Sequence, residues 1–207
     1  MPGKPAELLK DGDHRIGMPK TDRLVDGSLD RSALLNGMGL DKRNQTVLYA
    51  PTWRKESSLN KEGEAIIDAL AAMGLNVLVK IHDHSRDPRV NRRDWGAWLD
   101  SREEGPVRRI RDADVIPALH AADLLVSDAS SVANEYTLLD RPIIFMDVPE
   151  LLDVYASTAD MDTWGRRMGE VVENASLLPR AVERALGDPC AKSEIRQEAD
   201  LYLPLCR

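Results

Sequence analysis

The chain has 207 residues, a length that fits one ordinary domain or two small ones. Its 28 Lys and Arg residues against 35 Asp and Glu residues give a formal net charge of −7, which argues against a general nucleic-acid binder. Cys190 and Cys206 are too few for a disulfide framework, no apolar run nears the ~20 residues of a membrane span, and the N-terminal residues lack a signal-peptide core, so we expect a reducing, cytoplasmic compartment.

Residues 1–45 are rich in Gly, Pro and Asp and predict a lead-in, linker or partial domain junction, with one short helix near residues 32–36. From Thr46 onward, strand-like apolar runs alternate with amphipathic helical patterns. The predicted strands cover residues 46–50, 76–81, 107–110, 124–126 and 142–146. The predicted helices cover residues 62–73, 95–99, 114–122, 130–139 and 176–186.

The strands are apolar on both faces and are separated by helices, a pattern typical of a parallel sheet covered on both sides. We therefore predict an α/β fold, a Rossmann-like doubly wound parallel sheet. It forms one nucleotide-binding domain over residues 46–207, whose regular part ends near Leu186.

Polar side chains follow the strand that ends at Val126. Ser127, Asp128, Ser130 and Ser131 form a short turn before a predicted helix, and Glu135 lies one helical turn beyond Ser131. Because open α/β sheets bind ligands at the carboxyl ends of their strands, this turn predicts a phosphate site, with the carboxylate placed for ribose hydroxyls. In the alternative interpretation, Ser130 is only a helix N-cap and Glu135 a solvated charge.

Two other strands end in residues that suit the same ligand. Thr52 and Arg54 follow the first strand and offer a hydroxyl and a guanidinium to phosphate. His82 follows the second strand and could act as an acid or a charge partner of a diphosphate. His82 and His84 could also suggest a metal, but no Cys or carboxylate cluster of fitting spacing accompanies them, so we expect none. In the bland alternative, Trp53 only covers the core and His82 is a buried structural histidine.

Four segments in chain order then resemble one known family, and no Walker A loop or GxGxxG competes with it. They are residues 47–54 (VLYAPTWR), 78–82 (LVKIH), 125–136 (LVSDASSVANEY) and 139–145 (LDRPIIF), preceded by residues 17–22 (GMPKTD). Together they resemble the C-terminal half of the CDP-glycerol glycerophosphotransferases, the teichoic-acid polymerase and primase family, over about Gly17 to Leu186.

The resemblance implies the C-terminal, nucleotide-binding domain of a GT-B glycosyltransferase architecture. It gives His82 a role on the CDP diphosphate, Ser130 and Ser131 the phosphate contacts, Glu135 the ribose, and Arg54 a place beside them. Asp83 replaces the expected proline. Ala129 replaces the expected tyrosine.

The implied reaction transfers glycerol phosphate from a CDP-linked donor to a polymer or lipid-linked acceptor, with no cofactor beyond the substrate nucleotide. The family's N-terminal acceptor domain has no counterpart here, so we expect a truncated or split enzyme that works with a separate acceptor-domain protein. It would lie in the cytoplasm or peripherally on the inner face of the cytoplasmic membrane. Two alternatives stay open: a UDP-sugar glycosyltransferase or 2-epimerase-like GT-B protein, and an inactive nucleotide-binding module.

Overall fold

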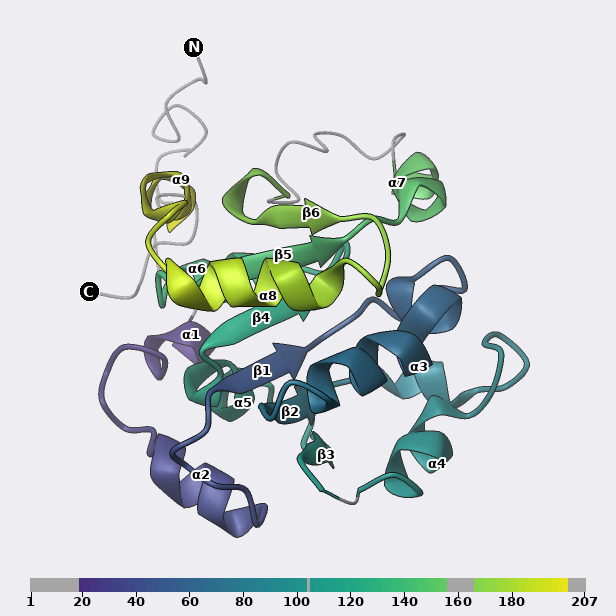
Figure 1. The fold of residues 1–207 in the computed structure, drawn as a ribbon, viewed down its shortest axis with the longest axis horizontal. Coiled ribbons are helices and arrows are strands. Elements are labelled where there is room, and N and C mark those ends of the chain that lie inside the picture. The colour runs from purple at the N-terminus through teal and green to yellow at the C-terminus, as the bar shows by residue number, and fades with distance from the viewer. Residues whose placement is uncertain (1–18, 104, 156–165, 201–207) are drawn as a thin grey trace, which may run out of the picture.

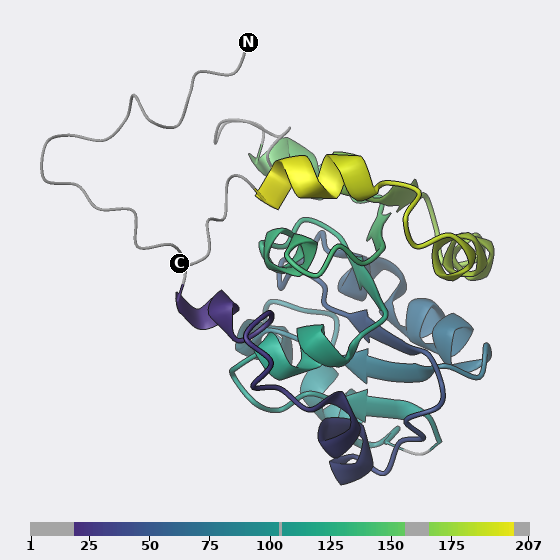
Figure 2. The same cartoon turned by 90° about the vertical axis from the view of Figure 1, so that its left-hand side faces the viewer.

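A computed structural model describes residues 19–103, 105–155 and 166–200 and shows a parallel sheet between two layers of helices (Figures 1 and 2). The strands are β1 (Thr46–Tyr49), β2 (Asn76–Val79), β3 (Val107–Arg109), β4 (Leu124–Ser127), β5 (Ile143–Met146) and β6 (Glu170–Val172). The helices are α1 (Pro19–Asp22), α2 (Arg31–Gly37), α3 (Ser58–Ala71), α4 (Trp95–Asp100), α5 (Ile116–Ala121), α6 (Val132–Thr137), α7 (Pro149–Tyr155), α8 (Leu178–Gly187) and α9 (Ser193–Asp200). Two short 3₁₀ turns, η2 (Asp83–Arg86) and η4 (Arg166–Met168), complete the described elements.

The strand order is β3-β2-β1-β4-β5-β6, and every neighbouring pair is parallel. The sheet grows outward from β1 in one direction and from β4 in the other. In the register, Val47 of β1 is opposite both Val77 of β2 and Leu124 of β4. The predicted doubly wound Rossmann-like fold is therefore confirmed, and its switch point lies between the carboxyl ends of β1 and β4.

Alternate residues of each strand face opposite layers, which explains why the strands read as apolar on both faces. Val47 and Tyr49 of β1 pack with the layer of α3, α4 and α8, whereas Leu48 packs with the layer of α2, α5 and α6 (Figure 2). Four-residue strands with no exposed residue thus form the centre of the core.

The five predicted strands are all present, and the sequence patterns missed β6. This strand has only three residues, and Val171 in its middle is exposed, so it gives no continuous apolar run. Helices α7 and α9 were also missed. The predicted helix at residues 62–73 begins earlier, at Ser58, and bends at Glu62, whose backbone is not helical. Gly74 follows this helix with a φ of +73°, a conformation that glycine adopts without strain.

The first described residues pack onto the sheet domain. The predicted helix near residues 32–36 is α2, and Leu24, Leu35 and Leu40 are buried in the core on the side of α5. The boundary at residue 45 stays a prediction. Gly17, Met18 and the segment 201–207, which includes Cys206, lie outside the described residues.

Candidate functional site

Three loops at the carboxyl ends of β1, β2 and β4 carry the side chains that the sequence singled out. The first loop holds Thr52 and Arg54, the second holds His82, and the third runs from Asp128 to the start of α6. The structure brings the first loop into contact with each of the other two.

Asp128 ties the loop after β4 to the loop after β1. Its side chain is fully buried. Oδ1 accepts hydrogen bonds from the backbone N–H groups of Thr52 (2.8 Å) and Ala129 (2.7 Å). Oδ2 accepts from the backbone N–H (3.0 Å) and the hydroxyl (2.8 Å) of Ser58. We call this arrangement the Asp128 clamp, and it fixes both loops across the switch point.

Two hydroxyls and a buried tyrosine reinforce the Asp128 clamp. Thr52 Oγ1 donates to the carbonyl of Ala129 (2.8 Å), and Ser127 Oγ donates to the carbonyl of Ala50 (2.7 Å). The Tyr49 hydroxyl lies 2.9 Å from Ser58 Oγ. Burial, together with the Asp128 carboxylate, holds the pKa of Tyr49 well above its usual value, so its hydroxyl stays neutral. Because Ser58 Oγ donates to Asp128, the tyrosine is the donor to Ser58.

Three residues that were predicted to contact the ligand make hydrogen bonds within the protein. Ser127 and Asp128 are fully buried and Thr52 is 7% exposed, and the hydroxyls and the carboxylate are engaged within the protein. Their direct contact with a nucleotide stays a prediction. What the geometry supports is that they hold the loops around a ligand.

The side chains of Ser130 and Ser131, in contrast, make no hydrogen bond with the rest of the described chain. Ser130 is half-buried and Ser131 is exposed. Ser131 is the N-cap residue of α6, but its side chain makes no capping bond, so the interpretation of Ser130 as a simple N-cap is wrong. Among the described residues, no acceptor takes a hydrogen bond from the N–H groups of Ser130, Ser131 or Val132.

The helix that follows is shorter than the sequence pattern predicted. α6 has six residues, so its macrodipole is small and the hydroxyls and N–H groups of the turn carry the polarity of this position. These groups are donors, which suits an anion.

Glu135 is buried, so its interpretation as a solvated charge is wrong. Its residue is 4% exposed, and its Oε1 accepts a hydrogen bond of 2.6 Å from Nζ of Lys20. Oε2 is buried and has no hydrogen-bond partner within the described part of the chain. Lys20 lies in the segment 17–22 that carries the family resemblance, but no local pattern marks it as a site residue.

His82 lies in a group of rings at the carboxyl end of β2. Its ring stacks on His84 with centroids 4.9 Å apart, and the Trp53 ring lies 6.2 Å from His82 and 5.0 Å from His84. The Arg54 guanidinium lies 5.1 Å from the centre of the Trp53 ring. His82 is exposed, so the interpretation of a buried structural histidine is wrong.

The hydrogen bonding of His82 fixes its neutral form. Nδ1 accepts from the backbone N–H of His84 (3.1 Å), which places the proton of the neutral ring on Nε2. Partial burial lowers the pKa of His82 below its usual value, and His84 and Lys80 add to this effect. The ring is therefore a hydrogen-bond donor through Nε2 at neutral pH.

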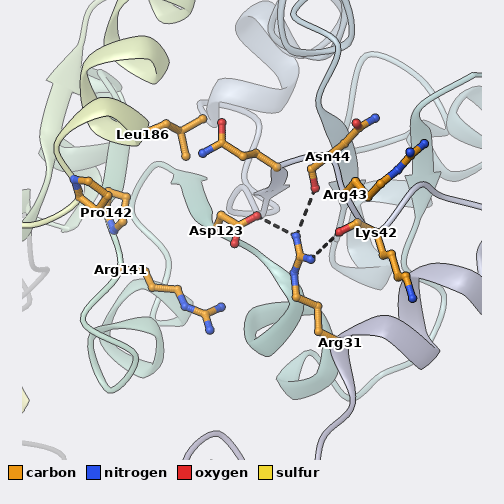
Figure 3. Close-up of a pocket in the computed structure, with 10 residues that line it drawn as sticks. Arg31, Lys42, Arg43, Asn44, Asp123, Arg141, Pro142 and Leu186 are labelled. Carbon is orange, nitrogen blue, oxygen red and sulfur yellow. Dashed lines mark hydrogen bonds and ion pairs between the residues drawn. The ribbon is translucent and has the colours of Figure 1, made fainter.

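The amino end of the sheet has a hollow of about 470 Å³ with several basic side chains (Figure 3). The Arg31 guanidinium at its centre donates to the carbonyls of Ala121, Lys42 and Asn44, to Thr46 Oγ1 and to Asp123. Arg141 donates to the carbonyls of His120 and Ala122. These arginines hold loops together, so we do not place the nucleotide here.

Neither a cluster of metal ligands nor a membrane-spanning helix is found in the described ranges. Within residues 19–103, 105–155 and 166–200, no three His, Cys, Asp or Glu side chains gather as metal ligands would. The expectation of a metal-free site stays a prediction. No helix of the described part of the chain is both long and apolar enough to cross a membrane.

A family model and a curated relative point to the same family. The family model described as CDP-Glycerol:Poly(glycerophosphate) glycerophosphotransferase matches residues 8–201. The teichoic acid glycerol-phosphate primase of Bacillus spizizenii is 27% identical over 183 residues, which is 86% of this chain and 40% of that protein. This chain thus spans well under half the length of that curated relative.

Solved structures share the fold. The wall teichoic acid polymerase TagF superposes with a TM-score of 0.66 at 20% identity, over 90% of this chain and 47% of that one. HepE from Anabaena, solved in complex with UDP and glucose, gives 0.58 at 17% identity, over 90% of this chain and 50% of that one.

Proposed function

This chain belongs to the CDP-glycerol:poly(glycerophosphate) glycerophosphotransferase family, and we propose that it holds the CDP-linked donor of such a transferase. The observation that carries the proposal is the set of donors at Ser130 and Ser131 that find no acceptor in the described part of the chain, beside the switch point of a doubly wound sheet. A diphosphate supplies the acceptors that this turn lacks.

In the proposed reaction, a hydroxyl oxygen of the acceptor attacks the phosphorus that carries glycerol. The bond from this phosphorus to the oxygen of CMP breaks, CMP leaves, and the hydroxyl proton passes to a base of the acceptor domain. Negative charge grows on the departing phosphate, and fixed donors stabilise such charge best because they need no rearrangement. We assign that role to the turn formed by Ser130 and Ser131, the serine turn, and to Nε2–H of His82.

The Asp128 clamp and the ring group of Trp53, His82 and His84 keep these donors in place. Arg54, which lies over Trp53, is near enough to the ring group to meet a phosphate oxygen as well. We further propose that the chain needs no metal, that a polymer or lipid-linked molecule is the acceptor, and that a separate acceptor domain at the inner face of the cytoplasmic membrane supplies the other half of the site.

The alternative of a UDP-sugar glycosyltransferase or 2-epimerase-like protein rests on a fold likeness to HepE, whose structure contains UDP and glucose. The alternative of an inactive module rests on the share of the relative that this chain spans. The glycosyltransferase or epimerase alternative differs from our proposal in the nucleotide donor that binds. The inactive module differs in that it binds the donor without turnover.

Titration calorimetry of the 207-residue chain with CDP, CDP-glycerol, UDP and UDP-glucose tests the donor. We expect CDP and CDP-glycerol to bind about tenfold or more tightly than the uridine ligands. Uracil exchanges a hydrogen-bond donor and an acceptor of cytosine, so protein groups that bond to cytosine would be left unpaired. Tighter binding of UDP-glucose would favour the glycosyltransferase, and no binding of any nucleotide would overturn the proposal.

Turnover needs a second measurement. We expect the chain alone to bind CDP-glycerol without extending a lipid-linked acceptor, and to support transfer when an acceptor domain is added. Product formation by the chain alone would contradict the proposed division of labour. Binding without turnover in the reconstituted mixture would favour the inactive module.

A further inference from the structure

An ion pair joins the first described helix to the candidate ribose carboxylate. Nζ of Lys20 in α1 lies 2.6 Å from Oε1 of Glu135 in α6, across 115 residues of sequence. The Lys20 side chain is 54% exposed, and that of Glu135 is 5% exposed. The carboxylate is thus held inside the protein, and the cation reaches it from the surface.

The carboxylate is only half satisfied. An ionised carboxylate offers about four acceptor positions on two oxygens, and a buried one normally has partners for both. Lys20 takes Oε1, whereas Oε2 is buried and has no hydrogen-bond partner among the described residues. This buried oxygen is thus an unfilled acceptor within the described part of the chain.

The ligand group that fits is a vicinal diol attached to a diphosphate. The backbone N–H of Glu135 bonds to the carbonyl of Ser131 (3.4 Å), so residue 135 lies one helical turn after the N–H groups that have no acceptor among the described residues. A nucleoside diphosphate has acceptors on its phosphates and, a few bonds away, two ribose hydroxyls that donate. The two parts of the site are complementary to these two parts of the ligand.

From this arrangement, and resting on the proposed function, we infer that Lys20 is a positioning residue for ribose recognition. It holds Oε1 and so fixes the rotation of the Glu135 carboxylate, which leaves Oε2 for the ribose hydroxyls. Without the ammonium, the buried charge would lose its cation among the described residues and the carboxylate would turn to find water.

Lys20 would act through Glu135, so its removal should matter only to ligands that carry ribose hydroxyls. We propose to titrate the 207-residue chain with CDP and with 2′,3′-dideoxy-CDP by calorimetry, at one pH and one salt concentration. The proteins are the wild type, Lys20→Met, Lys20→Arg and Glu135→Gln. Arg23→Met is the matched control, because Arg23 is an exposed cation near Lys20 in sequence that pairs with Asp114 instead.

We expect the wild type to bind CDP about 10- to 100-fold more tightly than the dideoxy ligand, the range for hydrogen bonds to a charged group. Lys20→Met and Glu135→Gln should reduce this ratio to about threefold or less while the affinity for dideoxy-CDP stays within about twofold. Lys20→Arg should restore most of the ratio, and Arg23→Met should leave it unchanged.

An equal loss for both ligands in Lys20→Met would mean that Lys20 contacts the phosphates directly, and an unchanged ratio would mean that it has no role. Either result overturns the inference while CDP still binds the wild type. Absence of CDP binding by the wild type would instead contradict the proposed function itself, and the ribose role with it. Circular dichroism checks that each variant is folded, and Lys20→Gln replaces the methionine variant if that one is not.

Discussion

The two ends of the sheet both gather charged and hydroxyl side chains, but they use them differently. At the amino end, the Arg31 guanidinium binds three backbone carbonyls, a hydroxyl and a carboxylate. At the carboxyl end, the Asp128 clamp is equally satisfied, yet Ser130, Ser131 and one oxygen of Glu135 have no such partners among the residues that the structure describes. Within residues 19–103, 105–155 and 166–200, the arginine of the first end has its acceptors, and the donors of the second end have none.

This difference is our reason for proposing the ligand at the carboxyl end of the sheet and not at the amino end. The hollow at the amino end has a volume of about 470 Å³ and basic walls, which would ordinarily suggest an anion site (Figure 3). Its two central arginines already have acceptors. The turn at the carboxyl end has donors without an acceptor among the described residues, so we base the proposed site on unmet hydrogen bonding and not on the volume or charge of a hollow.

The largest effect on stability should come from Asp128. Asp128→Ala removes the acceptor of four hydrogen bonds and leaves the N–H groups of Thr52 and Ser58 buried without one. We expect the free energy of unfolding to fall by about 3–5 kcal/mol, measured by urea denaturation. Asp128→Asn keeps one acceptor oxygen, so its free energy of unfolding should lie between those of the alanine variant and the wild type. A loss below about 1 kcal/mol in the alanine variant would mean that the clamp does not hold the loops.

The serine turn should give the opposite pattern. The double variant Ser130→Ala, Ser131→Ala should weaken CDP binding by about 3 kcal/mol, or about 100-fold, because two hydrogen bonds to a charged group are lost. Its unfolding free energy should stay within about 0.5 kcal/mol of the wild type, since neither hydroxyl has a protein partner in the described structure. Calorimetry and urea denaturation measure the two quantities, and unchanged CDP affinity would remove this turn from the site.

Arg31 provides the reciprocal test at the amino end. Arg31→Met should lower the free energy of unfolding by about 2 kcal/mol, because several carbonyls of the core edge lose their donor. The affinity of the folded variant for CDP should stay within twofold of the wild type. A tenfold loss of affinity would erase the distinction between the two ends.

The smallest effect concerns two histidines, one at each end. His82 lies at the carboxyl end and His120 lies beside Arg141 at the amino end, and burial lowers the pKa of both. A diphosphate near His82 favours its charged form, so CDP should raise the pKa of His82 and leave that of His120 unchanged. NMR titration with and without CDP measures both, with His82→Gln and His120→Gln for assignment, and equal shifts would contradict the placement of the ligand.

The same lowered pKa values give stability a direction with pH. The unfolded chain, with ordinary histidines near 6.5, takes up protons before the folded chain does. The free energy of unfolding should therefore be greatest above pH 6.5. It should decrease as the pH falls from 6.5 toward the lower pKa values that the two histidines have in the folded chain. His82→Gln should reduce this decrease.

The arrangement of the sheet was predictable because each central strand is a short run that is apolar on both faces. The same reasoning failed for β6, where Glu170 and Val171 are not buried and the strand is recognised only by its pairing with β5. The gathering of the candidate residues at one edge also followed from the sequence, since parallel strands place the residues after them at the same end of the sheet.

The roles of individual side chains at that edge were less predictable. Asp128 reads as a polar turn residue, and its partners Thr52 and Ser58 lie 76 and 70 residues earlier in the chain. Glu135 reads as an exposed helical charge, because the residue that holds it, Lys20, is 115 positions away. Local patterns place residues on elements, whereas these contacts arise only when distant loops meet.

The long separation within the Asp128 clamp has a consequence for the speed of unfolding. The clamp joins segments about 70 residues apart at the seam between β1 and β4, and contacts of such high order close late in folding. An interaction that is absent from the transition state slows unfolding and leaves the folding rate nearly unchanged. The clamp should therefore slow unfolding and prolong the time for which the two loops stay together. In stopped-flow experiments, Asp128→Asn should unfold faster than the wild type and refold at the wild-type rate.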